Sequence, residues 1–250
     1  MLYIILLISF VLFYTFGAIV GVKQTREKLK ADIVEAARVE YYKVVTFGQW
    51  IPVIALLLVL AFSDIALADI GFTLPSFQLN PVITAIVLGA ATLWTAYLLY
   101  MIIASLSSAK HRQRQNELLA KDASSNDYYN LVTSKLMTPR TKKEKRWWLP
   151  LSLSAGICEE VIFRGTFVFL VASIFPDISV YLVWIIVVAL FGLFHLYQGL
   201  KGFVVTTLAG TFLTLVYIVS GTLIFVIALH FLIDYAIAFR YSEGDTKHQA

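Results

Sequence analysis

The sequence predicts an all-α fold, a polytopic integral membrane bundle of about seven transmembrane helices. Hydrophobic residues make up 59% of the 250 residues and charged residues only 14%, and the mean hydropathy is +0.79. A soluble domain carries about 25% charged residues, so most of this apolar surface must face lipid rather than a core. The formal charge of +4 does not indicate a nucleic-acid partner, because the placement of the charges matters more than their sum.

Seven apolar runs are long enough to cross a bilayer. They are residues 1–22, 46–62, 81–105, 149–175, 180–196, 203–219 and 222–239. The first run has no basic residue ahead of it and no convincing cleavage site after it. We therefore expect an anchor rather than a signal peptide.

The basic residues outside these runs fall in alternate connections. The first and third connections are rich in Lys and Arg, whereas the second, fourth and sixth contain none. The positive-inside rule then predicts an external N-terminus and a cytoplasmic C-terminus, and seven spans require the same result. The compact loops favour a prokaryotic cell membrane. Apolar residues at helical spacing between Leu29 and Val44 also predict a helix along the membrane surface.

Six ionisable side chains lie inside the predicted spans. One charged side chain near the bilayer centre costs about 2.5–3.5 kcal/mol, so four without partners would cost about 10 kcal/mol. That cost is comparable with the stability of a whole domain, which indicates that function retains these residues. The six are Glu159, Glu160, Arg164, His195, His230 and Asp234.

These residues come from three helices but reach similar depths. Glu159 and Glu160 lie roughly 15 Å from the start of the fourth run, and His230 is near the middle of the seventh. His195 lies in the half of the fifth run that is predicted to face the cytoplasm, one turn after Phe191. The sequence therefore predicts a shared cavity between the three helices that water can reach.

Spacing within each helix suggests separate roles. Glu160 and Arg164 are four residues apart and can form an ion pair, whereas Glu159 is rotated by about 100° from Glu160. A carboxylate in a poorly solvated cavity suits a general base. Asp234 follows His230 by four residues and is predicted to hold one ring nitrogen, which leaves the other for a substrate.

Each feature also has a purely structural interpretation. Glu160 and Arg164 can equally be an ion pair that ties helices together, and a membrane histidine is often an interhelical hydrogen-bond partner. Two histidines at the depth of three carboxylates favour a site over these alternatives. Cys158 is interpreted as a small core residue rather than a nucleophile.

Three short motifs, each on a separate predicted helix, together resemble a known family. They are EExxxR from Glu159 to Arg164, FxxxH from Phe191 to His195, and HxxxD from His230 to Asp234. This order resembles the CPBP family, the CaaX proteases and bacteriocin-processing enzymes that are also called the ABI family. The first three spans carry none of the resemblance. We therefore divide the chain into N-terminal transmembrane helices with two basic connections (residues 1–146), a CPBP-like catalytic bundle (147–240) and a cytoplasmic tail (241–250).

The resemblance implies a helical membrane peptidase whose site opens towards the cytoplasm. In the family pattern Glu159 activates a water molecule with help from His195, and Arg164 holds Glu160. His230 and Asp234 would stabilise the oxyanion of the tetrahedral intermediate. The last motif of the family more often ends in asparagine, and an ionised aspartate cannot donate a hydrogen bond. Asp234 must therefore be protonated or must act by orienting His230.

Two interpretations of the cofactor follow from the same atoms. We predict a metal-free glutamate protease, because the sequence contains no HExxH helix. The alternative is a zinc site with His195, His230 and Glu159 as ligands. The sequence also lacks the GxSxG and GxGD motifs of serine and aspartyl intramembrane proteases.

The sequence thus predicts an intramembrane endopeptidase that hydrolyses peptide bonds by glutamate-activated water. Its predicted partners are the lipid bilayer and a peptide or protein substrate, lipidated or unmodified. Two other classes stay open: a non-catalytic relative acting as an immunity factor or scaffold, and a proton-coupled transporter that uses the buried groups as a relay. Retention of every motif position argues against the first, and the lack of an internal repeat argues against the second.

Overall fold

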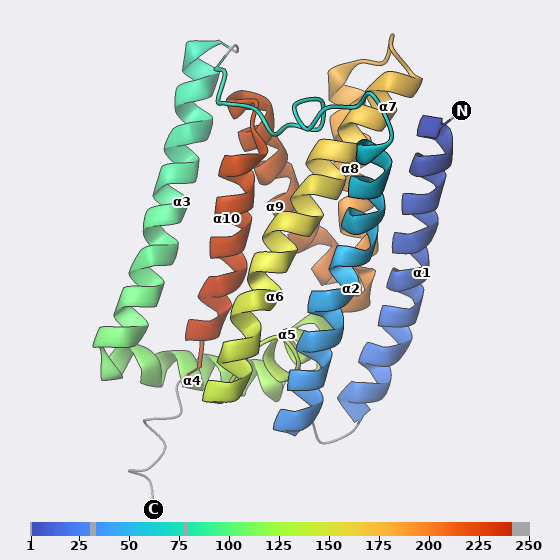
Figure 1. Cartoon of the computed structure of the whole chain (residues 1–250). Helices are drawn as coiled ribbons and strands as arrows, with labels where there is room; N and C mark the ends of the chain where they lie inside the picture. The colour runs from blue at the N-terminus through green and yellow to red at the C-terminus, as the bar shows by residue number, and fades with distance from the viewer. Residues whose placement is uncertain (1, 31–33, 78–79, 242–250) are drawn as a thin grey trace, which may run out of the picture.

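The structure is a computed structural model that describes residues 2–30, 34–77 and 80–241. Every regular element in those ranges is a helix (Figure 1). In chain order they are α1 (Leu2–Lys30), α2 (Glu35–Ala61), α3 (Pro81–Ser107), α4 (Ala109–Ala123), α5 (Tyr128–Lys135), α6 (Lys142–Glu160), η1 (Val161–Phe167), α7 (Val168–Ile174), α8 (Val180–Phe194), η2 (Leu196–Gln198), α9 (Gly199–Ser220), α10 (Leu223–Ala236) and η3 (Ile237–Phe239).

The predicted polytopic helical bundle is confirmed. Helices α1, α2, α3 and the stretch Leu196–Ser220 are long and apolar enough to cross a membrane, while α8 and Leu223–Phe239 are shorter apolar helices. The fourth predicted run corresponds to α6, η1 and α7, which follow one another without a break. Many large apolar side chains on these helices are exposed, as lipid-facing residues must be.

The predicted surface helix between residues 29 and 44 is wrong. Lys30 ends α1, and α2 begins at Glu35 and continues as one helix to Ala61. Residues 31–33 of that stretch lie outside the described residues. The start of α2 is held in the bundle because the Tyr42 side chain is fully buried against Trp148 of α6. The helix that does lie across the end of the bundle is α4 (Figure 1).

Helix α6 begins at Lys142, several residues before the predicted start at residue 149. Thr141 forms a capping box with Glu144, in which each side chain bonds the backbone N–H of the other residue. The same Glu144 carboxylate accepts two bonds of 2.8 Å from the buried Arg38 guanidinium of α2. This buried pair fixes the start of α6 against the N-terminal helices.

A wide π-helical turn, η1, follows the two glutamates of α6. All seven of its residues are buried, and the Thr166 hydroxyl bonds the carbonyl of Val161, five residues earlier. Gly165 lets this turn approach the loop after α2, since a Cβ there would lie 2.5 Å from the Ile70 carbonyl oxygen. Turns of this kind often occur at functional sites, and this one carries Arg164.

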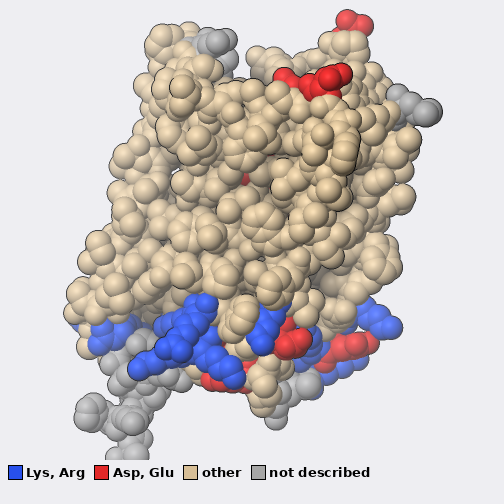
Figure 2. All heavy atoms as spheres, in the orientation of Figure 1, with Lys and Arg blue, Asp and Glu red and all other residues tan. Residues whose placement is uncertain are grey.

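Charge is distributed unevenly between the two ends of the bundle. In Figure 2 the Lys and Arg side chains gather at the end where α4 lies. The acidic side chains that are visible at the opposite end have no Lys or Arg beside them in this view. Helix α1 begins at the end opposite the one where α10 finishes (Figure 1), as an odd number of spans requires. Residues 242–250 of the predicted cytoplasmic tail lie outside the described residues, and the domain division and membrane orientation stay predictions.

Candidate active site

Glu160 and Arg164 form a buried ion pair, as their spacing predicts. Both side chains have zero exposure, and Arg164 Nη1 donates to Glu160 Oε1 at 2.9 Å. Arg164 Nη2 donates to the Gly210 carbonyl of α9 at 3.0 Å, and its guanidinium lies 4.4 Å from the centre of the Phe191 ring. The pair therefore links η1 to α8 and α9. It also compensates the buried charge of Glu160, which would be costly without a partner.

His230 forms a hydrogen bond with Glu160, a partner that the spacing did not predict, and a longer ion-pair contact with Asp234. Its Nδ1 lies 2.6 Å from Glu160 Oε1, whereas its Nε2 lies 3.7 Å from Asp234 Oδ2. An ionised Glu160 can only accept, so Nδ1 must donate. The contact is possible because Gly156 lets α6 and α10 approach closely: a Cβ there would lie 2.9 Å from the Phe231 backbone nitrogen.

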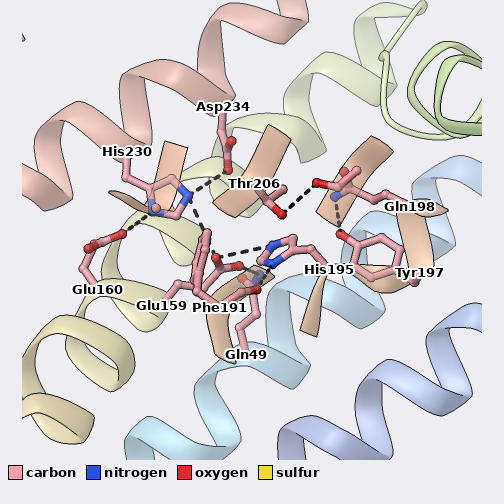
Figure 3. Close-up of polar contacts among 12 residues, drawn as sticks. Gln49, Glu159, Glu160, Phe191, His195, Tyr197, Gln198, Thr206, His230 and Asp234 are labelled. Carbon is pink, nitrogen blue, oxygen red and sulfur yellow. Dashed lines mark hydrogen bonds and ion pairs between the residues drawn. The ribbon is translucent and has the colours of Figure 1, made fainter. Parts of the chain in front are cut away.

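Glu159 points one carboxylate oxygen between the two histidines (Figure 3). Its Oε2 lies 3.9 Å from the Nε2 of His195 and 3.9 Å from the Nε2 of His230. This oxygen is buried and has no hydrogen-bond partner among the described residues. The other oxygen, Oε1, accepts from Gln49 Nε2 of α2 at 3.3 Å. Glu159 thus has one occupied oxygen and one free oxygen, and the free one faces both imidazoles.

His195 is oriented by the end of its own helix. It caps α8, and its Nδ1 lies 2.7 Å from the Phe191 carbonyl oxygen, which can only accept. Nδ1 therefore carries the proton, and in the neutral ring Nε2 is an acceptor directed at Glu159. The Phe191 ring packs against both imidazoles, at 4.6 Å from His195 and 6.3 Å from His230 between ring centres.

Two cavities meet at Glu159 and His195. The first, of about 210 Å³, is also lined by His230 and Asp234 and extends to Arg240 near the end of the described chain. The second, of about 280 Å³, is lined by residues of α1, α2, η1 and α8. Glu159, His195, Tyr41, Val45, Gln49 and Tyr197 line both. The predicted common cavity is present. Four of the six predicted site residues line it: Glu159, His195, His230 and Asp234. Glu160 is linked to it through its hydrogen bond with His230.

Sequence reasoning missed Gln49 and Tyr14. Gln49 lies in the second apolar run and Tyr14 in the first, and both line the second cavity beside Glu159. An amide inside an apolar run is a polar group that needs a partner, and this signal could have identified Gln49. Tyr14 gave no comparable signal, because most of its side chain is an apolar ring.

A zinc site is not evident from the side-chain positions. In the described ranges, no group of three His, Cys, Asp or Glu side chains comes together in an arrangement suited to a metal ion. Glu160 and the Phe191 carbonyl bond the two Nδ1 atoms, while both Nε2 atoms face Glu159 Oε2, an arrangement that is compatible with either kind of chemistry. The choice between metal-free and zinc-dependent chemistry stays a prediction that needs an experiment.

Comparison with protein families adds an independent finding. Residues 143–236 match the model of the type II CAAX prenyl endopeptidase Rce1-like family. Residues 143–236 are therefore similar to this family and are called the Rce1-like segment below. The match confirms the predicted resemblance to the CPBP family, and the Rce1-like segment includes all six predicted site residues. At the level of the family it supports a membrane peptidase with a peptide or protein substrate. Neither a curated protein nor a solved structure matches the chain.

Proposed function

We propose that this protein is an intramembrane endopeptidase in which Glu159 activates the attacking water. The observation that carries the proposal is the free Oε2 of Glu159, buried and 3.9 Å from two imidazole nitrogens. A separation of 3.9 Å is too long for a direct hydrogen bond. A water molecule near this oxygen can bond both Glu159 and an imidazole, which is the arrangement that general-base catalysis needs.

The reaction we propose begins when water attacks the carbonyl carbon of the scissile peptide bond. Glu159 takes the proton that the water loses, and His195 Nε2 accepts the hydrogen bond from its second O–H. A new C–O bond forms, and the carbonyl oxygen becomes an oxyanion. When the tetrahedral intermediate collapses, the C–N bond breaks and the proton on Glu159 passes to the leaving amine.

His230 is the group best placed to stabilise the oxyanion. A doubly protonated imidazole donates from both nitrogens, so Nδ1–H bonds Glu160 while Nε2–H is available for the substrate oxygen. Glu160 carries a negative charge beside this ring, and Asp234 Oδ2 lies 3.7 Å from Nε2. Both carboxylates favour the charged imidazole, so Asp234 acts by supporting His230 and need not donate a hydrogen bond itself.

The position of the cavities supports access from the cytoplasm for a membrane-associated substrate. The first cavity extends from Glu159 to Arg240, and the Lys and Arg residues gather at the same end of the bundle (Figure 2). By the positive-inside rule this end faces the cytoplasm. The second cavity has mostly apolar walls between α1 and α2, which suit an apolar or lipidated part of a peptide substrate.

The test is peptide cleavage by the full-length protein in proteoliposomes. We expect Glu159→Gln to lower kcat by about 100-fold or more, because a lost general base typically costs 10²–10⁴ in rate. The matched control is Glu117→Gln on α4, where an exposed carboxylate accepts from Gln113 and lies in neither cavity. Full activity of Glu159→Gln would refute the proposed mechanism.

The same assay with and without a chelator addresses the metal. We propose a metal-free reaction, so cleavage should persist after treatment with a zinc chelator that removes bound metal. Loss of activity that added Zn²⁺ restores would replace the proposal with the zinc site of Glu159, His195 and His230.

A further inference from the structure

Three buried polar atoms without partners surround the second cavity. They are the hydroxyl of Tyr14, Oε1 of Gln49 and Oε2 of Glu159, and each lacks a hydrogen bond within the described structure. All three residues line the same cavity. Leaving buried polar groups unsatisfied is costly, so this clustering points to a ligand that supplies the missing bonds. Glu159 is assigned to the attacking water, which leaves Tyr14 and Gln49 unexplained.

The orientation of Gln49 determines what it can bind. Its Nε2 donates to Glu159 Oε1 at 3.3 Å, and only this orientation avoids placing two acceptors side by side. Its carbonyl oxygen is therefore turned away from the carboxylate with no donor to meet it. Because Gln49 lines both cavities, this acceptor lies where a substrate chain would pass from one cavity to the other.

Tyr14 offers the complementary group. Its ring packs between Phe163 of η1 and Phe194 of α8, at 5.1 Å and 5.3 Å between ring centres. These contacts fix the ring, so the hydroxyl has little freedom to seek another partner. A hydroxyl can donate to a carbonyl oxygen, whereas the amide oxygen of Gln49 can only accept.

We propose that Gln49 and Tyr14 bind the backbone of an extended substrate segment. Gln49 accepts a backbone N–H, Tyr14 donates to a backbone C=O, and Gln49 also fixes which oxygen of Glu159 faces the water. An extended peptide has such groups free, whereas a helix has already paired them. The inference rests on the proposed protease function and deepens it: α1 and α2, outside the Rce1-like segment, complete the substrate site.

The first measurement compares kcat/KM for Gln49→Met and Tyr14→Phe with wild type. Each variant removes hydrogen bonds but keeps the shape, so we expect about a tenfold loss for each. Gln113→Met is the control for Gln49, because Gln113 also donates to a glutamate, at 3.1 Å, but on exposed α4. Tyr3→Phe is the control for Tyr14, because Tyr3 is on the same helix, α1, but packs edge-on against Phe169 of α7 and does not line the second cavity. Both controls should match wild type.

The deciding measurement is a double-mutant cycle that combines Gln49→Met with ester-for-amide changes in the substrate. The substrate is an apolar peptide with a quenched fluorophore that the wild type cleaves, and each ester replaces one backbone N–H that flanks the scissile bond. At one position the ester should lower wild-type kcat/KM by about tenfold and leave Gln49→Met almost unaffected. Equal effects on both proteins at every position would overturn the inference, even if Gln49→Met were less active.

The design separates this inference from the proposed function. If the wild type cleaves no peptide, or Glu159→Gln cleaves as well as wild type, the proposed mechanism fails. The ester series is then measured as binding of a fluorescent apolar peptide to wild type and Gln49→Met in detergent, and non-additivity at one position still supports the contact. If Gln49→Met does not fold, Gln49→Asn, which withdraws the amide by one methylene, takes its place with the same expected non-additivity.

Discussion

The N-terminal helices and the Rce1-like segment place their side chains in contrasting ways. Only 6% of the most apolar stretch of α1 is buried in the bundle, whereas 33% of the corresponding stretch within Leu196–Ser220 is buried. The Rce1-like segment buries Glu160 and Arg164 completely, whereas α1 mainly exposes apolar side chains. The contrast shows that the buried charged residues of the site lie among the C-terminal helices. Helices α1 and α2 separate that chemistry from lipid and shape the second cavity.

The largest expected effect comes from breaking the buried ion pair of the Rce1-like segment. Arg164→Met leaves the Glu160 charge without its guanidinium partner, so we expect a loss of about 3–5 kcal/mol in unfolding free energy. Thermal and denaturant unfolding in detergent micelles would measure it. Lys143→Met is the control, because the Lys143–Glu35 pair is 3.7 Å apart and largely exposed and should cost less than about 1 kcal/mol. Equal losses for the two variants would remove the contrast between buried and exposed pairs.

A smaller effect should follow from filling the second cavity. Gly17 of α1 lines it, and a Cβ at Gly17 meets no atom within 4 Å. Gly17→Leu should therefore fold and lower peptide cleavage by about tenfold, equivalent to about 1.4 kcal/mol, because the leucine occupies space that the substrate needs. Gly89→Leu on α3 is the matched control, since Gly89 is equally open but lines neither cavity beside Glu159. Undiminished cleavage by Gly17→Leu would show that substrate does not use this cavity.

The smallest effect tests the junction of the two regions. Thr141 caps α6 through the Glu144 backbone N–H at 3.2 Å. Thr141→Ala should lower the unfolding free energy by about 1 kcal/mol, while Thr141→Ser keeps the hydroxyl and should match wild type. Chemical denaturation in detergent distinguishes them. If alanine and serine behave alike, the cap does not stabilise the start of α6.

The sequence predicted the helical bundle because each span has to be apolar along its whole length. It also predicted the Glu160–Arg164 pair, which depends only on spacing within one helix. The hydrogen bond between His230 and Glu160 was missed, because it depends on how closely α6 and α10 pack at Gly156. Gln49 was missed for a similar reason, since its contact with Glu159 joins residues 110 positions apart.

The wide turn η1 makes the spacing of the EExxxR motif sensitive to chain length. Such a turn accommodates one residue more than regular α-helix does. Deleting a single residue from Val161–Phe167 would convert η1 to regular α-helix, so the side chains of α7 would keep nearly their present directions and Phe169 would still meet Tyr3 of α1. A deletion before Arg164 would instead shorten the EExxxR spacing by one residue. The extra residue is therefore absorbed within this short segment, and the outer half of the bundle does not depend on it.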